Sequence, residues 1–296
     1  QVTNLRIRSC LSTRARAVLE ADPKGDHVFW FSTHFSGYDR RKHDQGIAHY
    51  LPVHLGEIPD YYRRFIDPVD IAVFKTAPMD ANGFFNFGPS NLWMRALVER
   101  AKVVIVEECA ALPYVMGEGT GVHISEVDFV LTGDNQPMAE LPKPVITDVD
   151  RAVARLIAAE IEDGACLQIG IGGMPNAVCG LLAESNVQDL GIHTEMMTDG
   201  IVDLYRAGRI TGAKKQLNTG KMVCTFSLGA QYLYDFLHKN PMVEFHPVEV
   251  GTARRGTERA LGEADEARHR PRRRGGSRAH SSGAAGHRPH GRGAAS

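Results

Sequence analysis

Residues 165–201 run from Ala165-Cys-Leu-Gln-Ile-Gly-Ile-Gly-Gly-Met-Pro-Asn-Ala-Val-Cys179 to Gly191-Ile-His-Thr-Glu-Met-Met-Thr-Asp-Gly-Ile201 and decide how the chain folds. An apolar run enters a glycine-rich turn, a helical segment follows at about 176–184, and a second apolar run ends at Glu195. This order predicts a β-α-β unit, in which the crossover is right-handed and the two strands are parallel and usually adjacent. The glycine turn and Glu195 then share one sheet edge, where both can contact a single ligand.

The glycine turn at 170–173 suits a ligand that lies close to the backbone. Its glycines have no Cβ, and Pro175-Asn176 opens a helix whose free amides favour an anionic group or a developing oxyanion. The spacing is neither the dinucleotide motif G-x-G-x-x-G nor a P-loop. A glutamate at a strand end, such as Glu195, is more often solvated or salt-bridged than nucleophilic. The residues alone therefore leave the chemistry open.

The same alternation of strands and helices extends upstream. Strands are predicted at 27–31, 70–75 and 103–107, a further strand region at 47–55, and helices at 57–65 and 91–102. Downstream of the central unit, another strand is predicted at 221–226. This order is typical of an α/β fold with a largely parallel sheet. A segment with two prolines at 140–148 predicts a boundary between an N-terminal domain, 1–141, and a C-terminal domain, 142–250. A helix capped by Thr147 or Asp148 follows it.

Several polar groups near strand ends are weaker candidates. Glu107, Glu108 and the loop 116–121 follow a strand and face the expected ligand edge, although a plain surface loop explains them equally well. The charged run 39–44 is predicted to be solvated surface. A structural role is favoured for each histidine, with His34 and His193 as plausible substrate contacts.

Metal and hydrolase motifs are missing from the sequence. His193-x-Glu195 is not completed by the Pro-Cys-x-x-Cys of a zinc deaminase, so no metal site is predicted. No G-x-S-x-G serine elbow occurs either.

Length and composition limit the kinds of protein that the chain can be. At 296 residues and 43% hydrophobic, the chain can fill two domains that each bury a core. Its apolar runs are shorter than the ~20 residues that cross a bilayer, and no signal-peptide pattern opens it. Five widely spaced cysteines suit reduced thiols better than disulfides. We therefore expect a cytoplasmic protein that does not act at a membrane.

The last 46 residues differ from the rest. Residues 251–296 hold eleven Arg against four acidic residues, a local charge of +7, and the total of −1 then leaves about −8 for residues 1–250. An acidic body argues against nucleic acid as a partner. The tail has no aromatic residue and is predicted to be disordered. Its abrupt start suggests an out-of-frame end more than a nucleic-acid arm, and the missing initiator Met suggests a fragment.

Six segments carry longer motifs. Four lie around the central unit: Gln168-Ile-Gly-Ile-Gly-Gly-Met-Pro-Asn-Ala177, Leu190-Gly-Ile-His-Thr-Glu-Met196, Thr198-Asp-Gly200 and Asn240-Pro-Met-Val-Glu244. Two lie upstream: Thr76-Ala-Pro-Met-Asp-Ala-Asn-Gly-Phe-Phe-Asn-Phe-Gly88 and Val122-His-Ile-Ser-Glu-Val-Asp128. Together they resemble the acetyl-CoA hydrolase/transferase family, most of all its 4-hydroxybutyrate and butyryl-CoA:acetate CoA-transferase members. The likeness covers about residues 27–250.

The resemblance implies a fold and a mechanism. The fold is a two-domain α/β CoA-transferase-like structure with mostly parallel sheets. The carboxylate of Glu195 attacks an acyl-CoA thioester, a glutamyl-CoA thioester forms, and a second carboxylate accepts the CoA. CoA serves as a substrate and not as a permanently bound cofactor, and a homodimer or larger assembly is expected. The resemblance places the CoA contacts on Gly170, Ile171, Gly172, Gly173 and Met174.

Departures from the family limit these expectations. Family members have a further strand unit upstream and, beyond Glu244, a second glycine-rich motif and a Gln that contact CoA, where this chain has its basic tail. We therefore expect a chain truncated at both ends, with a partial C-terminal domain. Three functions stay open: a transferase between a short-chain acyl-CoA and acetate, 4-hydroxybutyrate or a similar carboxylate, an acyl-CoA hydrolase, or an inactive CoA-binding remnant. A nicotinamide-dependent dehydrogenase is a distant alternative.

Overall fold

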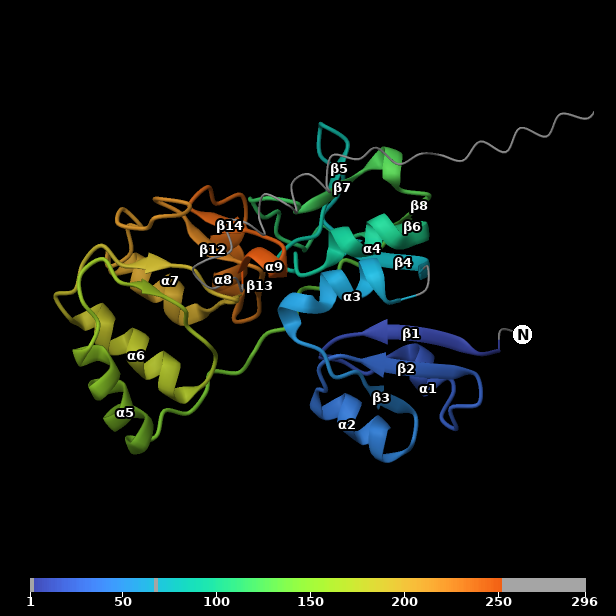
Figure 1. Cartoon of the computed structure of the whole chain (residues 1–296), viewed down its shortest axis with the longest axis horizontal. Coiled ribbons are helices and arrows are strands. Elements are labelled where there is room, and N and C mark those ends of the chain that lie inside the picture. Colours follow the sequence, from blue (N-terminus) through green and yellow to red (C-terminus); the bar gives the residue numbers. More distant parts are fainter. Residues whose placement is uncertain (1–2, 67–68, 252–296) are drawn as a thin grey trace, which may run out of the picture. The chain divides into compact units, whose positions relative to one another are not determined.

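The computed structural model describes residues 3–66 and 69–251 (Figure 1). These residues belong to one compact unit. Helices alternate with strands, and the strands are parallel in every sheet of the described residues except one two-stranded pair. The predicted α/β class with mostly parallel sheets is confirmed. The boundary near residue 141 stays a prediction, and the tail predicted to be disordered lies outside the described residues apart from Gly251.

The first sheet is formed by the N-terminal part of the chain. Its order is β1-β2-β3, with both pairs parallel. A small apolar cluster of Leu19, Val28, Trp30, Ile47 and Ala48 fills its core. The elements are β1 (Leu5–Ser9), α1 (Ala17–Glu20), β2 (Val28–Ser32), α2 (Gly37–Asp44) and β3 (Ala48–Tyr50).

The second sheet has the order β4-β6-β8 and is also parallel, while β5 and β7 form the antiparallel pair. The helix predicted at 91–102 spans only Met94–Arg100, and the amide of Asn91, before its start, donates to the carbonyl of Thr225 at 3.0 Å. The elements are η1 (Leu55–Glu57), α3 (Ile58–Arg64), β4 (Val69–Thr76), β5 (Phe84–Asn86), α4 (Met94–Arg100), β6 (Ala101–Glu108), β7 (Gly121–His123), η2 (Ile124–Glu126) and β8 (Phe129–Thr132).

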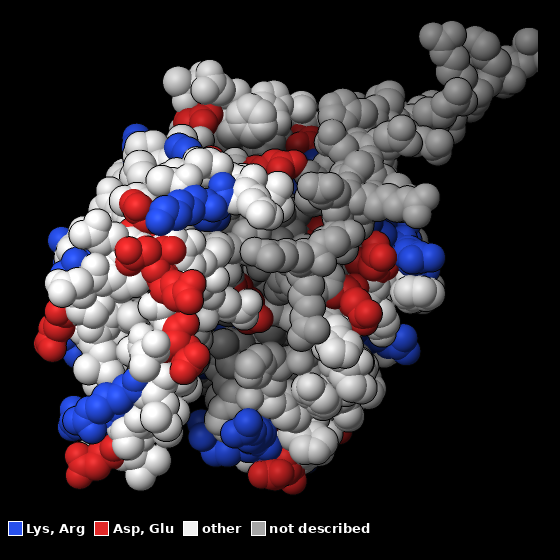
Figure 2. Space-filling view, turned by 60° about the vertical axis from the view of Figure 1, so that its left-hand side comes forward, with Lys and Arg blue, Asp and Glu red and all other residues white. Residues whose placement is uncertain are grey.

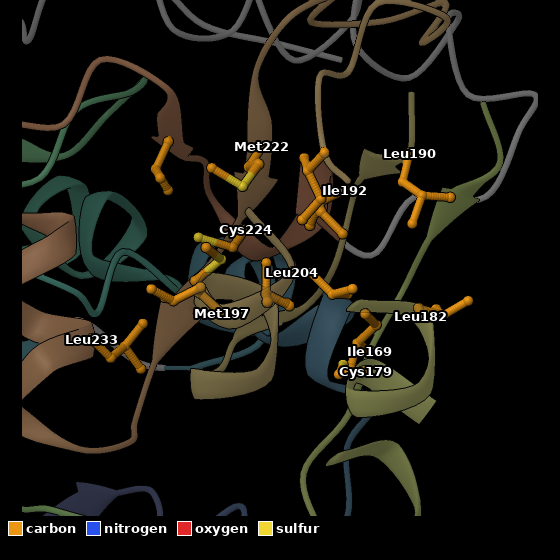
Figure 3. Packing of buried hydrophobic residues seen from close by; sticks show 14 of the residues in the cluster. Ile169, Cys179, Leu182, Leu190, Ile192, Met197, Leu204, Met222, Cys224 and Leu233 are labelled. Atoms are coloured by element: carbon orange, nitrogen blue, oxygen red, sulfur yellow. The ribbon is translucent and has the colours of Figure 1, made fainter. Parts of the chain in front are cut away.

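The C-terminal part surrounds the largest apolar cluster of the described residues, and Figure 3 draws part of its side chains. Its short strands pair in parallel as β10-β9, β11-β13 and β12-β14. Thr147 caps α5 as predicted. The elements are α5 (Asp148–Ala159), β9 (Cys166–Leu167), α6 (Gly173–Glu184), β10 (Gly191–Ile192), β11 (Met196–Met197), α7 (Asp199–Arg206), β12 (Met222–Cys224), β13 (Phe226–Ser227), α8 (Gln231–Leu237), β14 (Val243–Phe245) and α9 (Val248–Gly251).

The strand predicted at 221–226 is divided at Thr225. Cys224 pairs with Phe245 in β14, whereas Phe226 pairs with Met196 in β11. The amide of Thr225 donates to the carbonyl of Glu195 at 3.0 Å, so the chain changes its partner strand at this residue. One continuous segment therefore pairs first with β14 and then, from Thr225 onward, with the backbone of Glu195.

Asp39 corrects the prediction that the run 39–44 is solvated surface. Its carboxylate is buried and accepts the amides of Ser12 and Ser36 at 3.1 and 2.9 Å and the indole N–H of Trp30 at 3.2 Å. Lys42 is buried as well and pairs with Glu20 at 3.1 Å. Burial alone raises the pKa of Asp39, but hydrogen bonds from Ser36 and Ser12 outweigh it and hold the pKa below its ordinary value.

Close packing at Gly117 requires a glycine in the loop 116–121. Its φ is +129°, and a Cβ there would overlap the backbone nitrogen and carbonyl oxygen of Phe245. The loop pairs with β14 on both sides of this contact, through Phe245 N to Met116 O at 2.8 Å and Glu118 N to Phe245 O at 3.0 Å. The part of this loop that was a candidate ligand edge packs against a strand instead.

We expect Gly117→Ala to lower the free energy of unfolding by roughly 2–4 kcal/mol, because the strained φ and the backbone overlap cannot both be relieved. Gly180→Ala is the matched control. Gly180 lies within α6 with open space around its Cβ position, so alanine there adds about 0.5–1 kcal/mol of stability. Urea denaturation of both variants measures the difference, and equal midpoints contradict the close approach at Phe245.

Asp39→Asn is expected to lower stability at pH 7 by about 1–3 kcal/mol, because an amide cannot accept all the N–H groups that the carboxylate accepts. The folded pKa of Asp39 is depressed, so its stabilisation is present above the unfolded pKa of about 3.9 and is lost as pH falls through the folded pKa. The gap in melting temperature between wild type and variant should therefore narrow below about pH 4. Asp44→Asn, at the exposed end of the same helix, should leave the profile unchanged. A gap that is constant down to low pH contradicts the role of Asp39.

Candidate functional site

The hydroxyl of Thr194 joins the ends of β9 and β10, the two strands of the central unit. These strands are parallel and adjacent, as predicted, with Cys166 opposite Gly191 and Leu167 opposite Ile192. Beyond the ladder, the buried Thr194 Oγ1 accepts the amide of Ile169 at 3.2 Å. It can donate its single proton to the carbonyl of Ile169 or of Met196, each at 3.2 Å. Gly170 and Glu195, which come next in sequence, therefore leave the sheet from the same edge.

The backbone of Glu195 is fixed on its other side. Its carbonyl accepts the amides of Thr225 and Phe226 at 3.0 and 3.3 Å. The side chain is half-buried and lines a cavity of about 570 Å³. This volume lies within the roughly 300–1,000 Å³ that is typical of small-molecule sites.

The rest of the cavity comes from the carboxyl edge of the first sheet. Residues 33–35 directly follow β2, Tyr50 ends β3, and Val53, Leu55 and Ile58 belong to the segment that leads into α3. Ligand sites of open α/β sheets commonly lie at this edge. Most of the lining is apolar or aromatic, while the polar groups are Glu195, Thr33, His34 and Arg40.

The cavity combines an apolar wall with charges of both signs. Glu195 supplies a carboxylate, and Arg40 supplies a permanent positive charge. His34 can donate or accept a hydrogen bond. Such a lining suits a small molecule with a short hydrocarbon part and an anionic or polar end. Glu195 is half-buried, and a carboxylate with reduced hydration can act as a nucleophile.

The glycine turn lies beside this site but does not line the cavity. A Cβ at Gly170 would meet open space, and Ile171 is 59% exposed. Gly172 has a φ of +127° and forms the N-cap of α6. A Cβ at Gly173 would approach the carbonyl of Val145 at 2.7 Å. The turn therefore presents an open backbone surface at 170–172 and a packed one at Gly173.

Met174, the last residue predicted to contact CoA, is half-buried and packs against the large apolar cluster. Of the predicted CoA contacts, Gly170 and Ile171 present the most accessible surface.

The other predicted candidates lie partly in the cavity and partly elsewhere in the fold. His34 lines the cavity, as its place after a strand allowed. The backbone of His193 continues the strand pairing, through a bridge to Val223 and a 3.1 Å hydrogen bond to Leu167 O. Glu107 pairs with Lys75 at 3.0 Å, and Glu108 accepts the amide of Met79 at 3.0 Å. The side chains of Glu107 and Glu108 thus have partners within the fold, whereas a substrate contact of His193 stays a prediction.

Of the cavity residues, the sequence indicated only His34 and Glu195 as candidates, and Arg40 and Tyr50 are among those it missed. Arg40 belonged to the run predicted to be surface, and Tyr50 to a predicted strand region. Residues 33–35 and Tyr50 follow or end parallel strands of the first sheet, and this position at the carboxyl edge is the signal that could have identified them as cavity residues. No pattern in the sequence indicated that this edge faces Glu195, about 150 residues away.

The described residues show neither a metal site nor a membrane span. Among them, no group of three or more His, Cys, Asp or Glu side chains could hold a metal ion. None of their helices is long and apolar enough to cross a membrane. Basic and acidic side chains are interspersed on the face that Figure 2 shows, where the drawn charges form no continuous basic surface.

Comparison with known proteins identifies relatives of the whole described region. Residues 3–142 match the family model of the acetyl-CoA hydrolase/transferase N-terminal domain. Butyryl-CoA:acetate CoA-transferase of Anaerostipes caccae is 44% identical over 250 residues, which are 84% of this chain and 56% of that protein. The 4-hydroxybutyrate coenzyme A transferase of Clostridium kluyveri is 39% identical over 213 residues, 72% of this chain and 49% of that protein. The chain thus spans about half the length of these curated relatives.

Solved structures agree with the sequence comparisons. RipA from Yersinia pestis superposes with a TM-score of 0.76 at 30% identity and covers 84% of this chain and 59% of its own. A 4-hydroxybutyrate CoA-transferase from Porphyromonas gingivalis gives a TM-score of 0.68 at 30% identity, over 83% of this chain and 64% of its own. The β-α-β unit that carries Glu195 lies within a fold shared with CoA-transferases.

Thr194→Val should lower the free energy of unfolding by about 1–3 kcal/mol, because it leaves the buried polar groups of Ile169 without their partner. Thr194→Ser retains the hydroxyl and should lower the free energy of unfolding by less, mainly because the methyl group is missing. Urea denaturation at neutral pH measures both variants. If both substitutions lower the free energy of unfolding equally, the hydroxyl does not join the two strand ends.

Proposed function

Because the chain belongs to the acetyl-CoA hydrolase/transferase family, we propose that it moves CoA between a short-chain acyl-CoA and a carboxylate. One observation supports this most directly. Glu195 lies between β10 and β11 and lines a mostly apolar cavity that a cationic residue also lines. These are the properties that a carboxylate nucleophile and a small organic acid require.

The proposed reaction proceeds through Glu195 in balanced steps. A carboxylate oxygen of Glu195 attacks the thioester carbonyl of the acyl-CoA, the C–S bond breaks, and an acyl-glutamyl anhydride and CoA thiolate form. The thiolate then attacks the glutamyl carbonyl and releases the free acid, which leaves a glutamyl-CoA thioester. An acceptor carboxylate reverses these steps and leaves as the new acyl-CoA, so that Glu195 is regenerated.

The cavity wall contributes to this chemistry by limiting water around Glu195. A carboxylate is a weak nucleophile when it is fully hydrated, and apolar neighbours such as Phe35, Val53 and Ile58 reduce its hydration. Donors aimed at the developing oxyanion lower the barrier further. The backbone amides at the start of α6, next to the glycine turn, are the proposed donors.

We assign CoA to the glycine turn beside the cavity. Residues 170–172 offer open backbone, and α6 begins at Gly173 with free amides that favour an anionic ligand. Binding energy from parts of CoA remote from the thioester can then be used in the transition state. The proposed contacts are Gly170, Ile171, Gly172, Gly173 and Met174. A cytoplasmic homodimer or larger assembly belongs to the same proposal.

Glu195→Gln should abolish a covalent intermediate. After incubation with acetyl-CoA or butyryl-CoA, intact-protein mass spectrometry should detect a CoA adduct on the wild type and none on the variant, because an amide cannot form the anhydride. Transfer of CoA to acetate should fall by about 10³-fold or more. Glu184→Gln, at the end of α6, should behave as wild type.

The same assay separates the proposal from its alternatives. Loss of thioester at the same rate with and without acetate indicates hydrolysis instead of transfer. A wild-type protein that binds acyl-CoA without an adduct or turnover indicates a CoA-binding remnant. Either result contradicts the proposed transferase.

A further inference from the structure

The cavity at Glu195 contains one permanent positive charge among the residues that line it, the guanidinium of Arg40. The remaining lining consists of Glu195 itself, neutral polar groups and an apolar wall, with His34 as the other nitrogen base. The cavity is therefore polarised between a carboxylate and a guanidinium, and its hydrocarbon surface belongs to Phe35, Val53, Leu55 and Ile58.

Arg40 is available for a ligand. Within residues 3–66 and 69–249, its guanidinium forms no ion pair or hydrogen bond. The next residues of α2 differ, because Lys42 pairs with Glu20 at 3.1 Å and Arg41 lines a separate cavity of about 320 Å³. Arg40 forms no such contact within the described residues and lines the same cavity as Glu195.

An acid that reacts at Glu195 needs a nearby cation. Two carboxylates brought together in a cavity repel each other, and the repulsion grows as water is excluded. A guanidinium offsets this repulsion and can hold a carboxylate through two parallel N–H···O hydrogen bonds. Among the residues around this cavity, Arg40 has the right chemistry for that task.

We propose that Arg40 binds the carboxylate of the acid that enters or leaves the site, while the alkyl chain of the acid lies against Phe35, Val53, Leu55 and Ile58. This inference rests on the proposed function of Glu195. It adds to the proposed function the residue that recognises the carboxylate of the acid. The acyl-CoA carries no charge on its acyl group and therefore depends less on Arg40.

Binding of butyrate to the full chain tests the inference without requiring turnover. Saturation-transfer NMR is carried out on wild type, Arg40→Gln and Arg41→Gln, where the last variant removes a neighbouring charge of the same helix. We expect butyrate to bind wild type and Arg41→Gln equally and Arg40→Gln about tenfold more weakly, the loss of one charge-assisted interaction. Arg40→Lys should be intermediate, because it keeps the charge but not the planar fork.

Steady-state kinetics give a second readout. Arg40→Gln should raise the KM for acetate or butyrate about tenfold and change the KM for acyl-CoA by less than about twofold. Equal butyrate binding in Arg40→Gln and Arg41→Gln overturns the inference, and so does the absence of binding to wild type. Failure of the proposed function is visible separately, as the absence of a CoA adduct on Glu195.

Discussion

Two backbone hydrogen bonds to the carbonyl of Glu195, from Thr225 and Phe226, hold the site together. The segment that donates them is itself tied to the N-terminal part, through Asn91 N to Thr225 O at 3.0 Å and Ser227 N to Pro89 O at 2.9 Å. Glu195, which directly precedes the two-residue strand β11, is thereby fixed against elements more than 100 residues earlier in the chain. This arrangement requires the predicted strand 221–226 to be divided at Thr225, because the chain must stop pairing with β14 before it can pair beside Glu195.

Glycines in this protein serve two distinct purposes. Gly117 and Gly173 are required by close packing, against the backbone of Phe245 and against Val145 and Asp150. Gly170 has open space around it and is free to approach a ligand. Both kinds look alike in a sequence motif, since a motif records the absence of a side chain and not what fills the space. The loop 116–121 is therefore held by packing at Gly117, whereas the turn 170–173 has open space at Gly170.

The cavity joins groups of opposite character from distant segments. Glu195 comes from the C-terminal β-α-β unit, whereas Arg40, His34 and the apolar wall come from the carboxyl edge of the first sheet. The proposed reaction uses this division: the glutamate carries the covalent chemistry, the apolar wall limits water, and the guanidinium receives the acid. Each contribution by itself is common on protein surfaces. Their convergence on one cavity of about 570 Å³ supports the proposed site.

The sequence by itself determined the α/β class, the central β-α-β unit with its parallel adjacent strands, the Thr147 cap and the placement of Glu195 beside the glycine turn. These features depend on local periodicity, capping and the handedness of the crossover, which act over about 30 residues. Tertiary structure alone decided that Asp39 is buried, that Gly117 packs on β14, and that Arg40 and Tyr50 line the cavity of Glu195. Those features depend on contacts between segments far apart in the chain, and local sequence patterns carry no record of which surfaces meet.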